Sequence, residues 1–315
     1  MTETTKAVFA EHEVRKTREQ KAAFTDFVRA HAAAEGYQCR TEQGYLGARN
    51  IVIGNPDTAK VIYTAHYDTC AGMPFPNFIT PKCIWIYLLY QLLLTAVLLG
   101  VPALLVAGLH YLLSTYTAVT SSLLFILLEG VWLLLLVGEM ALLTVGPANR
   151  HTANDNTSGV TTLLDIMTAL PEGVRGEVAF VFFDLEETGL FGSAGFAKKH
   201  PKVKGTLLLN FDCVSDGDTI LFALRKGATR HAEAIRTAFP PTETLSVEVL
   251  SKGVFYPSDQ ANFPRGVGVA ALKKTKGGLL YMDRIHTKRD TVYKEENVAY
   301  LTEGAVRLAE SMARK

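Results

Sequence analysis

Cysteine is scarce in this sequence, and its charges nearly cancel. The 315 residues include four cysteines (Cys39, Cys70, Cys83 and Cys213), and no two of them form a CxxC pair, so a disulfide framework is not indicated. The 32 basic and 31 acidic residues leave a formal net charge of +1, which excludes a basic protein that binds polyanions. Nucleic acid is therefore not expected as a partner. Charged residues still make up 20% of the chain alongside abundant apolar ones, which excludes a disordered protein.

Basic residues are missing altogether from one long segment. No Lys or Arg occurs between Lys82 and Arg150, and the positive mean hydropathy of +0.15 comes from this segment. It contains two apolar runs, residues 83–109 and 123–145, and each exceeds the ~20 residues that cross a bilayer as a helix. The runs predict a transmembrane hairpin, and the alternative is a buried core hairpin or an apolar lid. The predicted domains are a discontinuous soluble domain and an inserted helical hairpin: residues 1–82 with 147–315, and residues 83–146.

The basic residues that flank the hairpin predict its orientation. Lys82 precedes the first run and Arg150 follows the second, whereas the connecting loop at 110–122 has neither Lys nor Arg. By the positive-inside rule, both chain ends face the cytoplasm while residues 83–145 contact the lipid bilayer. The N-terminal sequence MTETTKAVFAEHEVRK has no apolar h-region, so no signal peptide is expected. We therefore predict a two-span integral membrane protein whose soluble domain is cytoplasmic.

Two acidic residues lie within the second apolar run. Glu129 and Glu139 would be costly against lipid, so we expect them to face a helix, protein or water. In an antiparallel hairpin, Glu139 is predicted to lie at the depth of Gln91 and to be within hydrogen-bonding reach of it. A proton or ion path through the hairpin is the functional alternative.

Outside the hairpin, the sequence alternates short apolar runs with helical patterns. Continuous apolar runs such as EVAFVFF are typical of strands buried on both faces of a parallel sheet. Strands are predicted at residues 50–53, 60–64, 177–183, 205–211, 219–224, 267–272 and, before His286, 279–285. Helices are predicted at residues 5–35, 159–170, from about 192 onward, 228–239 and 296–312. The predicted fold class is α/β, with a mostly parallel central sheet flanked by helices.

Acidic and imidazole side chains follow several of these predicted strands. Ligands of such sheets bind beyond the carboxyl ends of the strands, so residues in these positions are candidates for a site. Five separate segments supply them: His66 and Asp68, Asp155, Glu186 and Glu187, Asp212, and His286.

Two imidazoles with several carboxylates, and no clustered cysteines, suit a hydrolytic site for zinc or a similar divalent ion. A pair of metal ions needs one shared carboxylate and terminal ligands on either side. In the predicted arrangement Asp155 bridges, His66 and Asp212 hold one ion, and Glu187 and His286 hold the other. The expected cofactors are therefore two divalent metal ions, with zinc favoured.

Two further acids have predicted catalytic roles. Glu186, adjacent to a ligand, is expected to act as the general base, and Asp68 is expected to orient the imidazole of His66. Each residue also has an ordinary interpretation when taken alone. Asp155 in NDN suits a helix N-cap, for example, and a Glu-Glu pair is common at a solvated helix start.

The motifs together resemble one enzyme family. They are AHYDT at 65–69, ANDNTSGV at 153–160, EETGLFGS at 186–193, NFD at 210–212 and IHTKRDT at 285–291. In order and context they are similar to those of the co-catalytic zinc aminopeptidases, relatives of secreted bacterial aminopeptidases and glutamate carboxypeptidase. The resemblance implies a zinc exopeptidase-like fold, the same five ligands and the same base.

The sequence departs from the family pattern in two places. Ser258, Asp259 and Gln260 stand where members often have Ser-Asp-His, which leaves the role of Gln260 open. The hairpin is inserted between the HYDT and NDN motifs, so we expect it to hold the active site close to the bilayer surface.

The predicted function is that of a membrane-anchored metallopeptidase, most simply an aminopeptidase that hydrolyses peptides with a metal-activated water and Glu186 as base. One alternative is a glutaminyl cyclase-like aminoacyl transferase with one zinc, and another is a non-catalytic peptidase-like membrane protein. The choice among aminopeptidase, carboxypeptidase and dipeptidase, the side-chain preference and self-association into a homo-oligomer all stay open.

Overall fold

A nine-stranded mixed sheet forms the centre of the protein in the computed structural model, which describes residues 1–116 and 121–314. Its strands run in the spatial order β1-β2-β4-β3-β5-β8-β6-β7, with β9 paired to β8. Their bounds are β1 Cys39–Gln43, β2 Arg49–Ile53, β3 Val61–His66, β4 Val178–Phe183, β5 Leu207–Phe211, β6 Thr219–Leu224, β7 Ser246–Leu250, β8 Gly266–Lys274 and β9 Leu280–Tyr281.

The middle of the sheet is parallel and its flanks are mixed. Strands β4, β3, β5 and β8 pair in parallel, whereas β1 with β2, β2 with β4, and β6 with β8 pair antiparallel. The predicted α/β class with a central sheet flanked by helices is confirmed. Strands β1 and β7 were not predicted, since their sequences CRTEQ and SVEVL mix polar and apolar residues. The strand predicted at 279–285 is reduced to the two residues of β9.

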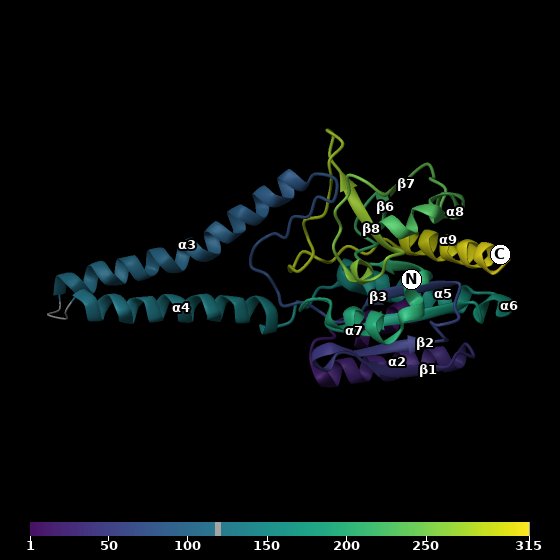
Figure 1. The fold of residues 1–315 in the computed structure, drawn as a ribbon, viewed down its shortest axis with the longest axis horizontal. Coiled ribbons are helices and arrows are strands. Elements are labelled where there is room, and N and C mark those ends of the chain that lie inside the picture. Colours follow the sequence, from purple (N-terminus) through teal and green to yellow (C-terminus); the bar gives the residue numbers. More distant parts are fainter. Residues whose placement is uncertain (117–120, 315) are drawn as a thin grey trace.

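Helices cover both faces of the sheet (Figure 1). They are α1 Glu3–Glu11, α2 Arg18–Ala34, α5 Gly159–Ala169, α6 Glu172–Arg175, α7 Phe191–Lys199, α8 Ala232–Ala238 and α9 Glu295–Ala313. Apolar residues of α1, α2, α5, α8 and α9 form one buried cluster with the sheet, and those of α7 form a second cluster. Tyr63 and Phe180 belong to the first cluster, while their neighbours Ile62 and Val181 belong to the second. This alternation places the two clusters on opposite faces.

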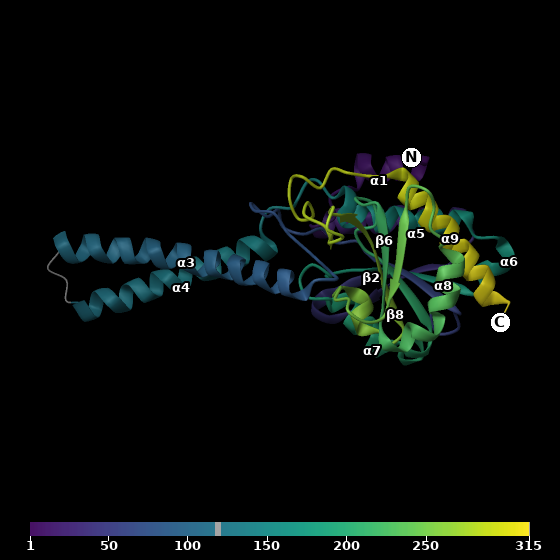
Figure 2. The same cartoon turned by 90° about the horizontal axis from the view of Figure 1, so that it is seen from above.

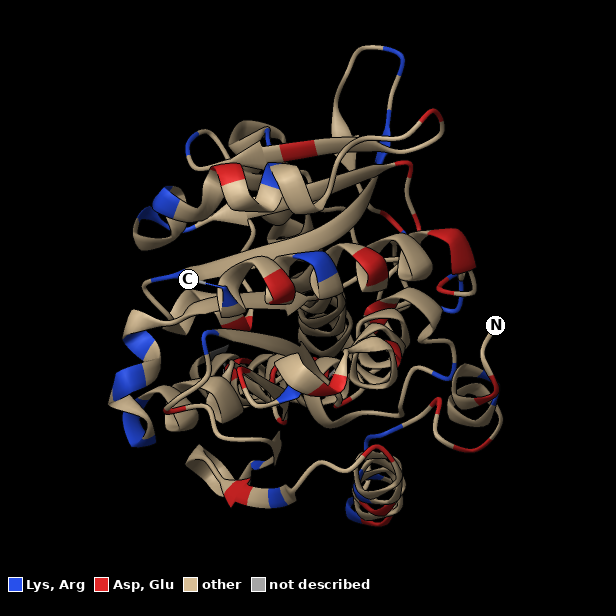
Figure 3. Cartoon of the chain, turned by 90° about the vertical axis from the view of Figure 1, so that its right-hand side faces the viewer, with Lys and Arg blue, Asp and Glu red and all other residues tan. Residues whose placement is uncertain are grey.

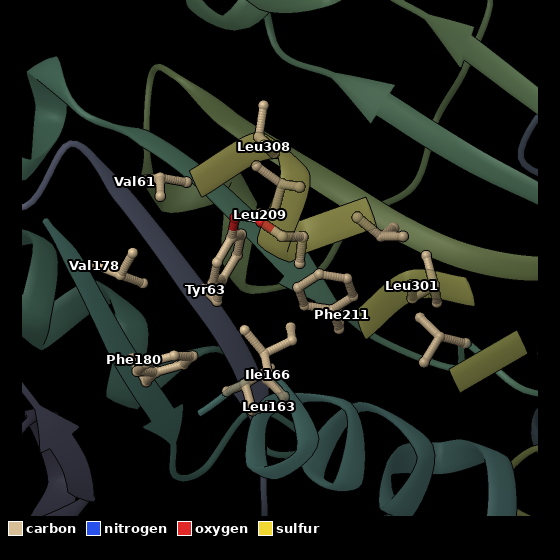
Figure 4. Packing of buried hydrophobic residues seen from close by; sticks show 14 of the residues in the cluster. Val61, Tyr63, Leu163, Ile166, Val178, Phe180, Leu209, Phe211, Leu301 and Leu308 are labelled. Atoms are coloured by element: carbon tan, nitrogen blue, oxygen red, sulfur yellow. Dashed lines mark hydrogen bonds between the residues drawn. The ribbon is translucent and has the colours of Figure 1, made fainter. Parts of the chain in front are cut away.

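The larger cluster is a close-packed core between the parallel strands, α5 and α9 (Figure 4). Tyr63 of β3 and Phe211 of β5 pack in one cluster with Ile166 of α5 and Leu301 of α9, and all four side chains are fully buried. Burial of such side chains contributes about 1.5–3 kcal/mol each. The parallel strands are thereby held rigidly, and so are the loops at their carboxyl ends.

The N-terminal region differs from the prediction of one helix at residues 5–35. It forms two helices, α1 and α2, because Thr17 caps α2 through reciprocal hydrogen bonds with Gln20. Arg15, in the break between the helices, is fully buried and donates a hydrogen bond from Nε to the carbonyl of Tyr67 at 2.6 Å. The break therefore ties the N-terminal helices to the segment that follows β3.

Two long apolar helices, α3 Ile84–Tyr116 and α4 Ser121–Val145, project from the sheet as an adjacent pair (Figures 1 and 2). Both are long and apolar enough to cross a membrane. Few of their residues are buried, and Leu104 and Leu134 are 75% and 73% exposed. The alternative of a buried core hairpin is therefore wrong.

Two details of the predicted hairpin are corrected by the structure. Helix α3 continues through His110 to Tyr116, so most of the predicted loop at 110–122 is helical, and residues 117–120 lie outside the described part. Because α3 is longer than predicted, residues of α4 lie beside α3 residues that are further from the sheet than expected. Glu139 lines an apolar cavity with Val97 and Val101, further along α3 than Gln91, and no hydrogen bond joins Glu139 to Gln91 among the described residues.

Candidate metal centre

The candidate metal centre lies where three adjacent parallel strands end. His66 is the last residue of β3, Glu186 and Glu187 follow β4, and Asp212 follows β5. Asp155 lies in the turn at residues 153–158 that leads into α5. Parallel strands present their carboxyl ends at one edge of the sheet, and this is where a ligand site is expected.

Asp155 lies between the two imidazoles. One of its carboxylate oxygens is 3.2 Å from Nε2 of His66, and the other is 2.9 Å from Nε2 of His286, which comes from the loop after β9. Nε2 of His66 is also 3.5 Å from a carboxylate oxygen of Asp212, and Nε2 of His286 is 3.1 Å from one of Glu187. The structure thus brings all five predicted ligands together as two groups that share Asp155.

The chemistry of this cluster fits a divalent cation. Donor atoms of His66, Asp155 and Glu187 all lie within 4.8 Å of one another. Oε1 of Glu187 is buried and has no hydrogen-bond partner in the described part of the chain. Carboxylates outnumber imidazoles around it, so the cluster carries an excess of acceptors and negative charge. Imidazole nitrogens and carboxylate oxygens are ligands that zinc accepts.

Contacts within the cluster shift the pKa values of its side chains. Burial opposes protonation of His66, but hydrogen bonds to Asp155 and Asp212 outweigh it and raise the pKa of the imidazole well above its usual value. Burial raises the pKa of Glu186 well above its usual value; His66 opposes this shift, whereas Asp212 adds to it. A divalent cation among these groups would favour neutral imidazoles and ionised carboxylates, the forms that ligate metals.

A pocket of about 220 Å³ opens onto the cluster. The five predicted ligands and the predicted base all line it: His66, Asp155, Glu187, Asp212, His286 and Glu186. Its walls are mainly apolar and come from Ile79, Tyr87, Phe255, Tyr256, Pro257 and Ile285, together with Cys213.

Comparison with known proteins identifies the family. A sequence profile for peptidase family M28 matches residues 141–307, which is more than half of the chain. The chain belongs to this family. The match spans Asp155, Glu186, Glu187, Asp212 and His286, and the family resemblance expected from the motifs is confirmed. No curated protein sequence gives a significant match.

Solved structures share the fold at low sequence identity. The LapA aminopeptidase of Legionella pneumophila matches with a TM-score of 0.54 and 12% identity, over 99% of this chain and 70% of the other. A leucine aminopeptidase precursor from Bacteroides thetaiotaomicron matches with a TM-score of 0.54 and 13% identity, over 96% of both chains. A glutaminyl cyclase from Porphyromonas gingivalis matches with a TM-score of 0.54 and 14% identity, over 98% of both chains.

In this peptidase-family chain, Asp68 contacts both His66 and the loop after β4. Its carboxylate lies 3.7 Å from Nδ1 of His66, whereas its backbone carbonyl lies nearer, at 3.2 Å. The carboxylate also accepts hydrogen bonds from the backbone amides of Glu186 at 3.0 Å and Glu187 at 3.3 Å. Asp68 therefore connects the end of β3 to the loop that carries the candidate base.

Asp290 supports the centre from outside and was assigned no role from sequence. It accepts hydrogen bonds from the backbone amides of Asn154 at 2.8 Å and Asp155 at 2.9 Å. Burial and the neighbouring charge of Asp155 raise the pKa of Asp290 to about 7, although the two amides oppose the shift. The available signal was its position within IHTKRDT, four residues after His286.

The segment that departs from the family pattern lies beside the centre. Gln260 accepts a hydrogen bond from Asn210 at 3.1 Å and donates one to the carbonyl of Tyr256 at 2.6 Å, so its amide links β5 to the pocket wall. Asp259 is fully buried, and burial together with the charges of Asp68 and other acids raises its pKa to about 7.

Two cysteines also reach the centre, although sequence reasoning gave them no role. Cys70 has its sulfur near Glu187 and His286, and Cys213 has its sulfur near Asp155 and Asp212. Burial raises the pKa of both thiols well above their usual value. The only sequence signal was that each cysteine lies close in the chain to a predicted ligand. Cys213 directly follows Asp212, and Cys70 lies four residues after His66.

Proposed function

We propose that this chain is a membrane-anchored, zinc-dependent aminopeptidase. The observation that carries the proposal is Asp155, whose two oxygens each contact a different imidazole at the floor of a small pocket. In this proposal Asp155 is the shared ligand, His66 and Asp212 complete one zinc site, and Glu187 and His286 complete the other.

When bound, zinc supplies Lewis acidity that activates water and polarises the scissile carbonyl group. Glu186 accepts the proton of the attacking water and transfers it to the leaving amine. Its side chain lines the pocket, and its backbone amide donates to Asp68, which keeps the base directed toward the cluster. Asp290 holds the backbone of Asp155 in place in the same way.

The composition of the pocket favours the amino terminus of a peptide as the bound end. A carboxypeptidase needs a cation for the terminal carboxylate, and no Lys or Arg is among the described residues that line this pocket. At about 220 Å³ the pocket is smaller than typical sites for drug-sized ligands, which suits the removal of a single residue.

The projecting hairpin supports membrane anchoring. Exposed apolar side chains cover α3 and α4. On the side of the sheet domain opposite the hairpin, acidic and basic residues are interspersed (Figure 3). In this proposal residues 83–146 form the anchor, and residues 1–82 with 147–315 form the catalytic domain on the cytoplasmic side. Protease treatment of intact cells tests the orientation, since digestion of the domain from outside would refute it.

The decisive test of the reaction is Glu186→Gln in the zinc-loaded protein. The change preserves size but removes the proton acceptor, so kcat should fall by about 10²–10⁴-fold while zinc content and folding stay unchanged. Mass spectrometry of peptide products shows which end the wild-type protein shortens. Comparable turnover by the Glu186→Gln protein would disprove its role as the base.

A glutaminyl cyclase activity is the second candidate, because glutaminyl cyclases are among the structures with the same fold. The proposed aminopeptidase and a glutaminyl cyclase differ in product and in metal content. Release of a free N-terminal residue with two zinc ions per chain supports the peptidase. Conversion of an N-terminal Gln to a cyclised end with one zinc ion supports the cyclase.

A further inference from the structure

A buried thiol lies against one half of the candidate metal centre. The sulfur of Cys70 and donor atoms of Glu187 and His286 all lie within 4.8 Å of one another. Cys70 is only 4% exposed, and its thiol makes no hydrogen bond within the described part of the chain. The sulfur is therefore within reach of a cation that Glu187 and His286 hold.

The carboxylate of Glu187 independently indicates a ligand in the same place. Its side chain is only 7% exposed, and one of its oxygens lies 3.1 Å from Nε2 of His286. The other oxygen, Oε1, is buried and has no hydrogen-bond partner among the described residues. A buried ionic oxygen without a partner is costly, and a cation between Glu187, His286 and Cys70 satisfies it.

Backbone hydrogen bonds hold the segment of Cys70 beside the loop of His286. The carbonyl of Cys70 accepts a hydrogen bond from the amide of Asn149 at 3.1 Å. Three residues further along, the amide of Met73 donates to the carbonyl of His286 at 2.7 Å. Because these two segments are bonded to each other, the fold itself fixes the sulfur close to the imidazole.

Cys213, the other cysteine at the centre, has different contacts. Its thiol donates a hydrogen bond to Oδ1 of Asp212 at 3.1 Å, and the same oxygen lies 3.5 Å from Nε2 of His66. Cys213 also lines the catalytic pocket, whereas Cys70 does not. Of the two thiols, that of Cys70 is the one without an acceptor, and it lies outside the space open to substrate.

We propose that Cys70 is a ligand of the ion that Glu187 and His286 hold. The assignment rests on the proposed zinc-dependent function and adds a residue to its metal centre. On ligation the S–H bond breaks, a sulfur–metal bond forms and the proton passes to solvent, so Cys70 binds as a thiolate. Thiolates select zinc over magnesium and manganese, which prefer oxygen ligands. This half of the centre accordingly favours zinc over those two ions.

The extra ligand makes the two halves of the centre unequal. With the shared Asp155, the half that contains Cys70 supplies four protein donors, whereas the half formed by His66 and Asp212 supplies three. Zinc sites with four protein donors are closed, and those with three keep an open position. Burial raises the pKa of Glu186, and His66 and Asp212 are the charged neighbours that act on it most strongly. The open position therefore lies in the half beside the base, and the Cys70 half retains its ion.

The first experiment uses Co²⁺ as a spectroscopic probe of the metal-free, full-length protein in lipid nanodiscs. A thiolate bound to Co²⁺ gives a charge-transfer band in the near ultraviolet, which imidazole and carboxylate ligands do not give. We expect the band in wild type and not in Cys70→Ser. The matched control is Cys213→Ser, which keeps a hydrogen-bond donor toward Asp212 and should retain the band. A band that survives in Cys70→Ser overturns the assignment.

Metal stoichiometry from equilibrium dialysis separates failure of this assignment from failure of the proposed function. Wild type that binds two Co²⁺ per chain without the band overturns ligation by Cys70 and leaves the zinc-dependent function standing. Wild type that binds neither Co²⁺ nor Zn²⁺ overturns the proposed function itself.

A second measurement needs no variant. X-ray absorption at the zinc edge of wild type loaded with two zinc ions reports sulfur neighbours directly. We expect one sulfur at about 2.3 Å from one of the two ions, beside nitrogen and oxygen neighbours at about 2.0–2.2 Å. A spectrum explained by nitrogen and oxygen neighbours alone overturns the assignment.

A third measurement compares zinc affinities by competition with a chromophoric chelator. Cys70→Ser should weaken one of the two zinc sites by about tenfold or more, since even the loss of a group that supports a ligand costs about 10–100-fold. The other site should keep its wild-type affinity. Equal weakening of both sites, or of neither, overturns the assignment.

Discussion

Asp68 provides a sharp test of how the fold positions the candidate base. Its carboxylate accepts from the amides of Glu186 and Glu187, while its backbone carbonyl is the nearer contact of His66. Asp68→Asn keeps the carbonyl and one side-chain acceptor but turns an amide NH₂ toward the second donor. One of the two backbone N–H groups then loses its acceptor. Water does not readily replace that acceptor, because Asp68 is only 3% exposed.

The size of the effect follows from that one contact. Hydrogen bonds to a charged acceptor contribute about 1.5–3 kcal/mol, so the change should cost about 2 kcal/mol. If the lost hydrogen bond displaces Glu186 and raises the free energy of the transition state by the same amount, kcat/KM falls about 30-fold. Zinc content should stay complete at saturating zinc, because Asp68 is not a proposed ligand.

The assay compares kcat/KM, zinc content and urea unfolding of wild type, Asp68→Asn and the control Asp26→Asn. Asp26 lies on α2 with a side chain that is 73% exposed, and its ion pair with Arg29 is on the surface, so the control should behave as wild type. Wild-type kcat/KM in Asp68→Asn would refute the reasoning, since it would show that the two amide contacts do not position the base.

Three further predictions concern metal binding and stability. Asp155→Asn should lower zinc content measured by elemental analysis, because the shared ligand loses one anionic oxygen and its charge. Burial alone would raise the pKa of Glu42, but contacts led by His200 lower it to about 2 from the usual 4.5, so the ionised carboxylate should stabilise the fold at neutral pH, by an amount that solvent screening reduces. That stabilisation is complete above about pH 5 and is lost as the pH falls toward 2, a dependence that urea titrations of Glu42→Gln should lack. Lys21→Met should cost about 3 kcal/mol in unfolding, because it leaves the buried carboxylate of Asp184 without its cation.

Each of these has an outcome that contradicts it. Full zinc occupancy in Asp155→Asn would show that Asp155 is not a shared ligand. An unchanged acid dependence in Glu42→Gln would assign the titration to another group. For the buried pair, the double variant Lys21→Met/Asp184→Leu should recover part of the lost stability, and a further loss would point to a packing role for Lys21 instead.

Prediction from sequence worked best where one local pattern was sufficient. The strand at 219–224 and the helix at 296–312 have continuous or periodic apolar residues, and the structure places β6 and α9 there. It failed where the partner is distant in the chain. The break between α1 and α2 depends on Arg15 being buried against Tyr67, and the edge strands β1 and β7 depend on neighbours that their own residues do not indicate.

The candidate site shows the same division. The residue types and the order of the motifs were sufficient to predict which side chains gather, because parallel strands deliver their ends to one edge. The supporting contacts were not predictable. Asp290 is identified only by the amides of Asn154 and Asp155 that it accepts, and Tyr87 lies 21 positions after His66 within a segment that reads as membrane anchor.

The sequence by itself determined which parts this protein contains. They are an α/β domain interrupted by an apolar hairpin, and a set of acids and imidazoles in the order of a metallopeptidase. These follow from periodicity and residue chemistry, which are local. Only the tertiary structure decided that each oxygen of Asp155 meets a different imidazole, that Asp68 contacts the base through backbone amides, and that the hairpin contributes a wall to the pocket. Those contacts join residues far apart in the chain, and their geometry is set by how the whole domain packs.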